Sequence, residues 1–183
     1  RVASLPLAEF VPSDSVGCGP LTVNSFNPTP QGAFGSYTYY WDFGGIDTSF
    51  DFIPGPFTFP PPLFNDTVYV VEFRVYSAAC QAVDVAFANI LVSPIPTTIV
   101  EADTTSFCSP YAVTFTNNTV GQPETFFIDW GDDSSDTTGN PSWNTITHEF
   151  VNNTLDTVVY NVFITFQNSC GFTDTIIPIT EIG

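Results

Sequence analysis

Positive charge and long apolar runs are both nearly absent from this sequence. Its 183 residues include no lysine, no methionine, one histidine and two arginines, against nineteen acidic residues, which gives a formal net charge of −17. Nucleic acids and anionic membranes are bound by clusters of basic side chains, so this deficit excludes both as partners. No stretch approaches the roughly 18 apolar residues of a membrane-spanning helix, so we expect no membrane insertion.

The residues that are present can build a core. Hydrophobic residues are 43% of the chain and aromatic residues 16%, while charged residues are only 11%. Disordered chains have the opposite composition, so we expect a folded protein of one large or two small domains. The sequence begins at Arg1 without a methionine, and we therefore expect a processed protein or a segment of a longer chain.

The four cysteines indicate a duplication. Cys18 and Cys80 are 62 positions apart, as are Cys108 and Cys170, and the second pair follows the first by 90 positions. The flanking matches are Cys18-Gly-Pro-Leu-Thr-Val with Cys108-Ser-Pro-Tyr-Ala-Val, and Asp66-Thr67-Val68 with Asp156-Thr157-Val158. Such fixed spacing is typical of a repeated structural unit.

The same spacing predicts disulfides. Zinc sites usually need closely spaced cysteine pairs, and the sequence has none. We expect one disulfide in each half, Cys18–Cys80 and Cys108–Cys170, formed in an oxidising compartment. The alternative is two reduced, buried cysteines in each half.

Apolar and polar residues alternate along many short segments, which predicts half-buried β-strands. The residues expected to face the core are Tyr39, Trp41 and Phe43; Tyr69, Val71, Phe73 and Val75; Val113 and Phe115; Phe126, Ile128 and Trp130; and Tyr160, Val162, Ile164 and Phe166. Turn residues separate these segments about every 8–12 positions, which favours an all-β fold of two sandwiches. The prolines of Val92–Thr98 indicate an extended link, so we place the domains at 1–96 and 97–183.

The turns of both halves resemble those of PKD domains, which are immunoglobulin-like sandwiches. The second half has Asp129-Trp130-Gly131-Asp132, then His148-Glu149-Phe150, and Asn168-Ser169-Cys170-Gly171 near its end. The first half has Trp41-Asp42-Phe43-Gly44, a degenerate form of the same turn. The opening Cys-x-Pro-Leu-x-Val is similar to that of PKD repeats in secreted proteins of Bacteroidota.

This resemblance implies two tandem PKD-type sandwiches from a type IX-secreted surface adhesin. We therefore expect an extracellular, non-catalytic spacer or stalk that presents or forms an adhesin. Gliding motility is one process in which such an adhesin could act. Its expected partners are neighbouring repeat modules, surface polysaccharide or other cell-surface proteins. The alternative is an accessory carbohydrate- or protein-binding module of a secreted hydrolase.

The Asp-rich turn of the second half has two interpretations. In the structural one, Trp130 fills the core, Gly131 permits a tight reversal and Asp132 caps backbone N–H groups. Trp41, Phe43 and Gly44 are expected to play the matching roles in the first half. In the functional one, calcium is bound by carboxylate oxygens, the ligands that a hard cation prefers. The candidate ligands are Asp129, Asp132, Asp133 and Asp136.

Catalysis finds little support in the sequence. A Ser-His-Asp triad would have to use His148, the only histidine, and its place in a predicted strand favours a structural role. The aromatic segment Phe50–Phe64 is either a sticky edge for sugars or a neighbouring module, or an edge strand and loop folded onto the core.

A repeated tripeptide predicts sugar attachment. Asp followed by Ser or Thr and then a small or β-branched residue resembles the O-glycosylation signal of exported Bacteroidota proteins. The candidate sites are Ser15, Thr67, Thr104, Thr137, Thr157 and Thr175.

Overall fold

The computed structural model describes residues 5–29, 36–137 and 139–182. By its internal contacts the chain divides into two compact units. Unit 1 is Arg1–Pro62 with Asp66–Ser93, and unit 2 is Leu63–Asn65 with Pro94–Gly183. The expected boundary near Pro96 lies inside the segment that belongs to unit 2. The described ranges contain strands and turns, and none of their segments is a helix that could cross a membrane.

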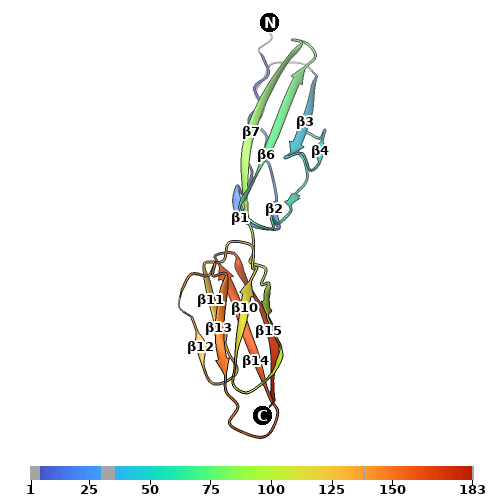
Figure 1. Ribbon diagram of the computed structural model, residues 1–183. Coiled ribbons are helices and arrows are strands. Elements are labelled where there is room, and N and C mark those ends of the chain that lie inside the picture. The colour runs from blue at the N-terminus through green and yellow to red at the C-terminus, as the bar shows by residue number, and fades with distance from the viewer. Residues whose placement is uncertain (1–4, 30–35, 138, 183) are drawn as a thin grey trace. The chain divides into compact units, whose positions relative to one another are not determined.

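Unit 1 is a sandwich of a large and a small sheet (Figure 1). The large sheet has the order β1-β7-β6-β3-β4, and the small one pairs β2 with β5. The strands are β1 (Val16–Cys18), β2 (Leu21–Val23), β3 (Tyr37–Phe43), β4 (Thr48–Ser49), β5 (Phe57–Phe59), β6 (Thr67–Ser77) and β7 (Ala82–Ser93). Strand β1 runs parallel to β7, and the other pairs are antiparallel.

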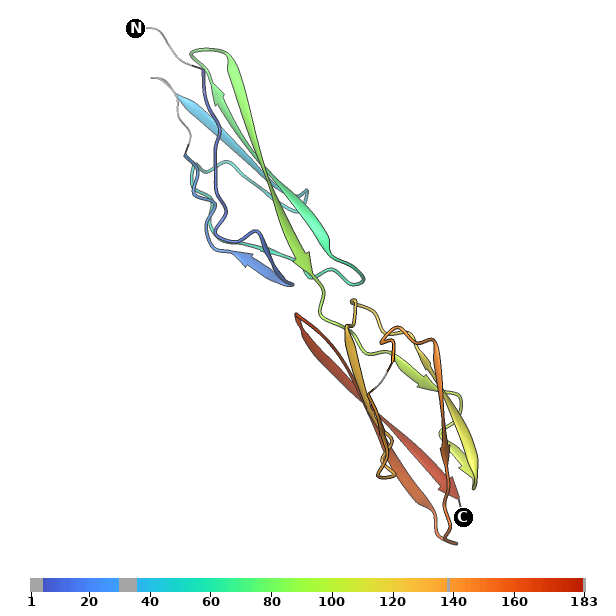
Figure 2. The ribbon, with the colours of Figure 1, turned by 90° about the vertical axis from the view of Figure 1, so that its left-hand side faces the viewer.

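Unit 2 is also a sandwich of two sheets (Figure 2), and it repeats this topology with one further strand, β8, in the small sheet. Its large sheet has the order β12-β11-β14-β15-β9, which corresponds strand for strand to that of unit 1, and its small sheet is β13-β10-β8. The strands are β8 (Val100–Ala102), β9 (Ser106–Cys108), β10 (Tyr111–Asn117), β11 (Thr125–Asp129), β12 (Ser135–Asp136), β13 (Thr145–Phe150), β14 (Val158–Asn168) and β15 (Gly171–Ile182). The duplication seen in the cysteine spacing is therefore a duplication of the fold.

Each unit has its own core, and the predicted alternation of the strands is confirmed. In β6, Val71 and Phe73 are fully buried and Val75 is 1% exposed, because every second residue of a strand faces the same side. The equivalent strand β14 buries Val162 and Ile164 in the same way. The small sheets close the sandwiches, since Val23 of β2 and Val113 of β10 lie in the respective cores.

The segment that follows β7 is held by unit 2. The Asn168 side-chain amide donates to the carbonyl oxygens of Pro94 (2.9 Å) and Gly121 (3.0 Å). Gly121 has a φ of +89°, and a Cβ there would lie 2.6 Å from the Ile95 carbonyl oxygen, so only glycine fits. The turn between β14 and β15 therefore lies beside the residues through which the chain enters this unit.

Candidate functional site

A polar cluster of unit 2 is built around Trp130, which follows β11 and is 4% exposed. His148 of β13 stacks on the Trp130 ring, with centroids 4.3 Å apart and planes at 5°. The His148 Nε2–H donates to Asp132 Oδ2 at 2.7 Å. Asp132 Oδ1 also accepts hydrogen bonds from the backbone N–H and the hydroxyl of Ser134. The turn thus places one carboxylate between a strand histidine and its own loop.

Hydrogen bonding dominates the ionisation of Asp132. Partial burial raises the pKa of this carboxyl, but the hydrogen bonds from Ser134 and His148 outweigh it, and the net pKa is lowered. Because folding lowers the pKa, the ionised carboxylate stabilises the folded unit above the ordinary Asp value of about 4. This contribution is lost as the pH falls from about 4 through the lower value of the folded state.

We expect Asp132→Asn to destabilise unit 2 at pH 7 by on the order of 1 kcal/mol, because charge-assisted hydrogen bonds become neutral ones. The difference from the wild type should shrink as the pH falls below about 4, where the wild-type carboxylate also loses its charge. Thermal melting between pH 2 and pH 7 measures this. Asp133→Asn is the matched control, since it removes the same charge from an exposed neighbour. Equal effects of both substitutions would contradict the assignment.

Unit 1 has an apolar counterpart of the cluster. Phe43 at the end of β3 takes the place of Trp130, and Phe57 of β5 stacks on it at 4.6 Å and 10°, as the histidine does in unit 2. Trp41 is fully buried, and Asp42 Oδ1 accepts the Gly45 N–H at 2.6 Å across the turn. Gly44 of this turn has a φ of +68°. The two turns therefore have a similar backbone shape, but a phenylalanine packs on the first and a hydrogen-bonded histidine on the second.

The calcium prediction is not supported by the geometry. The described part of the chain has no group of three or more His, Cys, Asp or Glu side chains arranged to hold a metal ion. Asp129 Oδ1 accepts a hydrogen bond from the Gly131 N–H at 2.9 Å, and Asp132 accepts hydrogen bonds from Ser134 and His148. Asp133 is exposed with a φ of +67°, and Asp136 lies on β12. The four carboxylates are close in sequence, but the hydrogen bonds of Asp129 and Asp132 direct these two side chains to different partners.

The core of unit 2 holds a carboxyl group that the sequence analysis did not single out. Glu181 of β15 is fully buried, and neither of its carboxyl oxygens has a hydrogen-bond partner of ordinary geometry. Tyr160 of β14 is 9% exposed, and burial followed by the nearby Glu181 carboxyl raises the pKa of its hydroxyl. A glutamate in an alternating β-strand predicts an exposed side chain, so no sequence signal marked this position.

Both predicted disulfide pairings are wrong. Cys18 and Cys170 are disulfide-bonded, whereas Cys108 is a free, exposed cysteine. Cys80 lies half-buried in the turn between β6 and β7, where its N–H donates to Ser77 Oγ at 3.4 Å.

The length of the strands explains the error. Cys18 ends β1 beside Ser93, the last residue of β7, while Cys80 lies just before the first residue of that 12-residue strand. At about 3.3 Å per residue, the two cysteines are more than roughly 30 Å apart. A disulfide needs Cα atoms within about 7 Å. In unit 2, Cys108 pairs with Ile182 at the end of β15 that is remote from Cys170, so the second predicted pair is out of reach as well.

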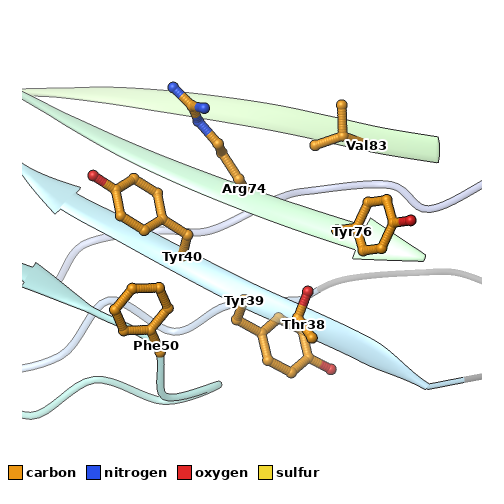
Figure 3. A pocket seen from close by; sticks show the side chains of 7 residues that line it. All are labelled: Thr38, Tyr39, Tyr40, Phe50, Arg74, Tyr76 and Val83. Atoms are coloured by element: carbon orange, nitrogen blue, oxygen red, sulfur yellow. The ribbon is translucent and has the colours of Figure 1, made fainter. Parts of the chain in front are cut away.

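A shallow hollow lies on the outer face of the large sheet of unit 1 (Figure 3). It has a volume of about 520 Å³ and is lined by Thr38, Tyr39, Tyr40, Phe50, Arg74, Tyr76 and Val83. The Arg74 guanidinium lies 5.5 Å from the Tyr40 ring centroid, and the Phe50 ring lies 5.6 Å from the same ring. Arg74 also forms an ion pair with Glu72 on the same strand. Aromatic faces and a guanidinium are thus presented together to solvent.

The aromatic segment Phe50–Phe64 is partly folded onto the core and partly exposed, so each of its two expected interpretations fits a part of it. Phe59 of β5 is fully buried and Phe57 is half-buried, as expected for an edge strand folded onto the core. Phe50 is 74% exposed and lines the hollow, while Leu63 and Phe64 are exposed as well. The segment therefore contributes to the core through its strand and to the surface through its loops.

The six O-glycosylation candidates differ in their exposure to solvent. Ser15, Thr137 and Thr157 are exposed. Thr67, Thr104 and Thr175 are half-buried, and the Thr104 hydroxyl donates to the Ser106 carbonyl oxygen at 3.0 Å. Occupancy of these sites stays a prediction.

The arrangement of Ser134, Asp132 and His148 differs from that of a catalytic triad. In a triad the imidazole lies between the carboxylate and the nucleophile. Here the carboxylate lies between the hydroxyl and the imidazole, and one ring face of the imidazole packs against Trp130. The cluster therefore holds the turn against the core.

No protein-family profile and no curated protein matches this chain. It is similar to a mutated titin fragment of domains I67–I69, with a TM-score of 0.52 and 10% identity over 99% of this chain and 66% of that chain. It is also similar to the four N-terminal Ig domains of Dscam1, with a TM-score of 0.45 and 12% identity over 100% of this chain and 46% of that one. The first likeness defines the class: an all-β protein of tandem immunoglobulin-like sandwiches.

Proposed function

We propose that the chain is a non-catalytic structural or adhesive segment of a large extracellular cell-surface protein. The observation that carries this proposal is the duplication: two sandwiches of one topology, each with its own core, follow one another in the chain. Units that bury their own cores can be repeated to add length without redesigning a neighbour. The finer assignment to PKD-type repeats of a type IX-secreted adhesin, with a role in gliding motility, is supported by sequence motifs: the turn residues, the segments that begin at Cys18 and Cys108, and the repeated Asp-Ser/Thr tripeptide.

The surface chemistry suits such a segment. Disulfide-bonded cysteines favour an oxidising compartment, which agrees with an extracellular location. Nineteen acidic residues against two arginines give every copy the same strong charge, which keeps neighbouring chains apart. The proposed partners are further repeat modules of the same protein and other cell-surface proteins.

Surface proteolysis tests the location. Intact cells of the native host are treated with a protease, and the released peptides are identified by mass spectrometry. We expect peptides of this segment before lysis, some of them with sugar on Ser15, Thr137 or Thr157, the exposed candidates. A segment that is cleaved only after lysis would refute the extracellular role.

The hollow of unit 1 favours a second candidate function, binding of surface polysaccharide. Sugar rings pack on aromatic faces, and the hollow presents Tyr40, Phe50 and Tyr76 beside a guanidinium. This would be the activity of an accessory carbohydrate-binding module. It is compatible with an adhesive role for the same segment.

We expect Phe50→Ala to weaken retention on immobilised host polysaccharide by at least fivefold, because it removes an exposed ring that packs on Tyr40. Affinity electrophoresis of the whole chain through gels containing the polysaccharide measures this. Phe172→Ala removes a similarly exposed ring, 67% accessible, from unit 2 and should leave retention unchanged. If the wild-type chain migrates identically with and without polysaccharide, this second function is wrong.

A further inference from the structure

The hollow of unit 1 holds a positive charge, which is rare in this chain. Arg74 of β6 is one of two arginines among nineteen acidic residues, and the sequence has no lysine. The other arginine, Arg1, lies outside the described residues. Of the side chains that line the hollow, that of Arg74 is the one charged at neutral pH. The hollow therefore offers an anion the opposite of the charge that dominates the chain.

Two neighbours hold the guanidinium and leave one of its edges free. Arg74 Nε–H donates to Glu72 Oε1, and this ion pair is the one hydrogen-bonded contact of Arg74 with the described part of the chain. The guanidinium carbon lies 5.5 Å from the centroid of the Tyr40 ring. The Arg74 side chain is still 53% exposed. The edge with the two terminal NH2 groups is thus left to solvent, and this pair of donors matches the two oxygens of a carboxylate.

Aromatic rings lie beside this free edge (Figure 3). The Phe50 ring is 5.6 Å from the Tyr40 ring at an angle of 59°, and Phe50 is 74% exposed. Because Tyr40 neighbours both Phe50 and the Arg74 guanidinium, ring faces and a carboxylate-binding edge share one hollow. A uronic acid has both complementary groups, since its carboxylate is attached directly to a sugar ring whose C–H bonds pack on aromatic faces.

The backbone beneath the hollow is already paired. At Arg74, strand β6 pairs with Tyr40 of β3 on one side and with Val85 of β7 on the other. A peptide that adds to a sheet as a further strand needs an unpaired strand edge. Recognition in the hollow must therefore use side chains, which favours a sugar over a peptide strand.

We propose that the hollow of unit 1 binds an acidic sugar, a uronic acid residue of a polysaccharide, with its carboxylate on the Arg74 guanidinium and its ring on Tyr40 and Phe50. This inference deepens the second candidate function, polysaccharide binding, and its biological role rests on that function. The net charge of −17 repels a polyanion at long range. At about 0.15 M salt, charges more than about 8 Å apart are largely screened, and the contact at Arg74 decides the preference.

The test compares two acidic polysaccharides with neutral forms of the same polymers. The whole chain is run through gels that contain polygalacturonate or alginate, and through gels that contain either polymer after reduction of its carboxyl groups to alcohols. At about 0.15 M salt we expect at least one acidic polymer to retain the chain at least about fivefold more strongly than its reduced form, because hydrogen bonds between charged groups are the stronger ones. If neither acidic polymer is preferred over its reduced form, the proposal is overturned.

Arg74→Gln should abolish the preference for the acidic polymer, because it removes the charged pair of donors but keeps a long polar side chain. Arg1→Gln gives the same net charge and is the control for mobility, so it should keep the preference. Calorimetry verifies that unit 1 still folds in the Arg74 variant. A preference that survives Arg74→Gln would overturn the proposal.

A double variant separates loss of the guanidinium from repulsion by the carboxylate that it leaves behind. Glu72→Gln combined with Arg74→Gln removes both members of the ion pair, and we expect the preference to stay lost. Its recovery would show that unpaired Glu72 was the cause, which contradicts the proposal. Poly-glutamate supplies carboxylates without sugar rings and should compete at least about fivefold less well than the acidic polysaccharide. Equal competition would assign the hollow to acidic peptides instead.

Failure of this inference and failure of polysaccharide binding give different results. Retention on host polysaccharide that Phe50→Ala weakens, but that reduction of the carboxyl groups leaves unchanged, would keep the second candidate function and refute the acidic sugar. Retention by polygalacturonate or alginate without any on host polysaccharide would refute that function in the host and support the chemistry assigned to the hollow.

Discussion

Replacing Trp41 by alanine is expected to lower the free energy of unfolding of unit 1 by about 4 kcal/mol. Trp41 is fully buried, and its ring stacks on Phe73 with centroids 4.1 Å apart. It also meets Phe10 edge-on at 5.0 Å, and its Nε1–H donates to the Asp51 carbonyl oxygen at 3.0 Å. The substitution removes the largest core side chain and leaves a cavity that the rigid strands cannot close.

Calorimetry of the whole chain measures this effect. The transition of unit 1 should fall by roughly 20 °C, since about 1 kcal/mol shifts the melting temperature of a domain of this size by 4–8 °C. The transition of unit 2, which has its own core, should stay in place. Phe87→Ala is the control, because Phe87 belongs to the same sheet but is 64% exposed. A shift of both transitions together would show that the two cores are energetically coupled.

The cores were predictable from the sequence because they depend on a local rule. A strand alternates its side chains between two faces, so a period of two identifies the buried face without knowledge of the neighbours. Val71, Phe73, Ile128 and Ile164 all follow this rule. The turn residue Gly131 was equally readable, and its φ of +77° suits glycine.

The disulfides and the hollow were not predictable in the same way. Equal spacing of cysteines reveals a repeat but not which end of a hairpin each cysteine occupies. The pairing of Cys18 with Ser93 through a parallel β1 decides that, and parallel pairing has no local sequence signal. The hollow needs Tyr40 and Arg74 to be neighbours on one face, which requires the register of β3 against β6. The loop ring of Phe50 then lies against them by tertiary packing.

Glu181→Leu is expected to stabilise unit 2 by about 1–3 kcal/mol, the reverse of what most core substitutions do. The carboxyl oxygens are buried without ordinary hydrogen bonds, and an unsatisfied buried polar group costs free energy that an apolar side chain does not. Unit 1 already has an apolar residue at the corresponding core position. Val92 is fully buried at the second-last position of β7, as Glu181 is at the second-last position of β15, so an apolar side chain suits this place in the core.

Glu181→Gln is the matched control, because it keeps the shape of the side chain and leaves polar atoms buried. We expect little gain from it, and a gain equal to that of Glu181→Leu would point away from desolvation as the cause. A lower melting temperature for Glu181→Leu would contradict the argument.

The ionisation of Tyr160 supplies an independent readout. The Glu181 carboxyl is one cause of the raised pKa of Tyr160, so Glu181→Leu should lower this pKa towards its ordinary value while burial still keeps it raised. A raised tyrosine pKa stabilises the folded state below the ordinary value of about 10, and the contribution is lost as the pH rises through the folded value. Removing the carboxyl should therefore flatten the alkaline loss of stability in unit 2. Ultraviolet titration of the phenolate, combined with melting above pH 9, distinguishes this electrostatic effect from a simple gain in packing.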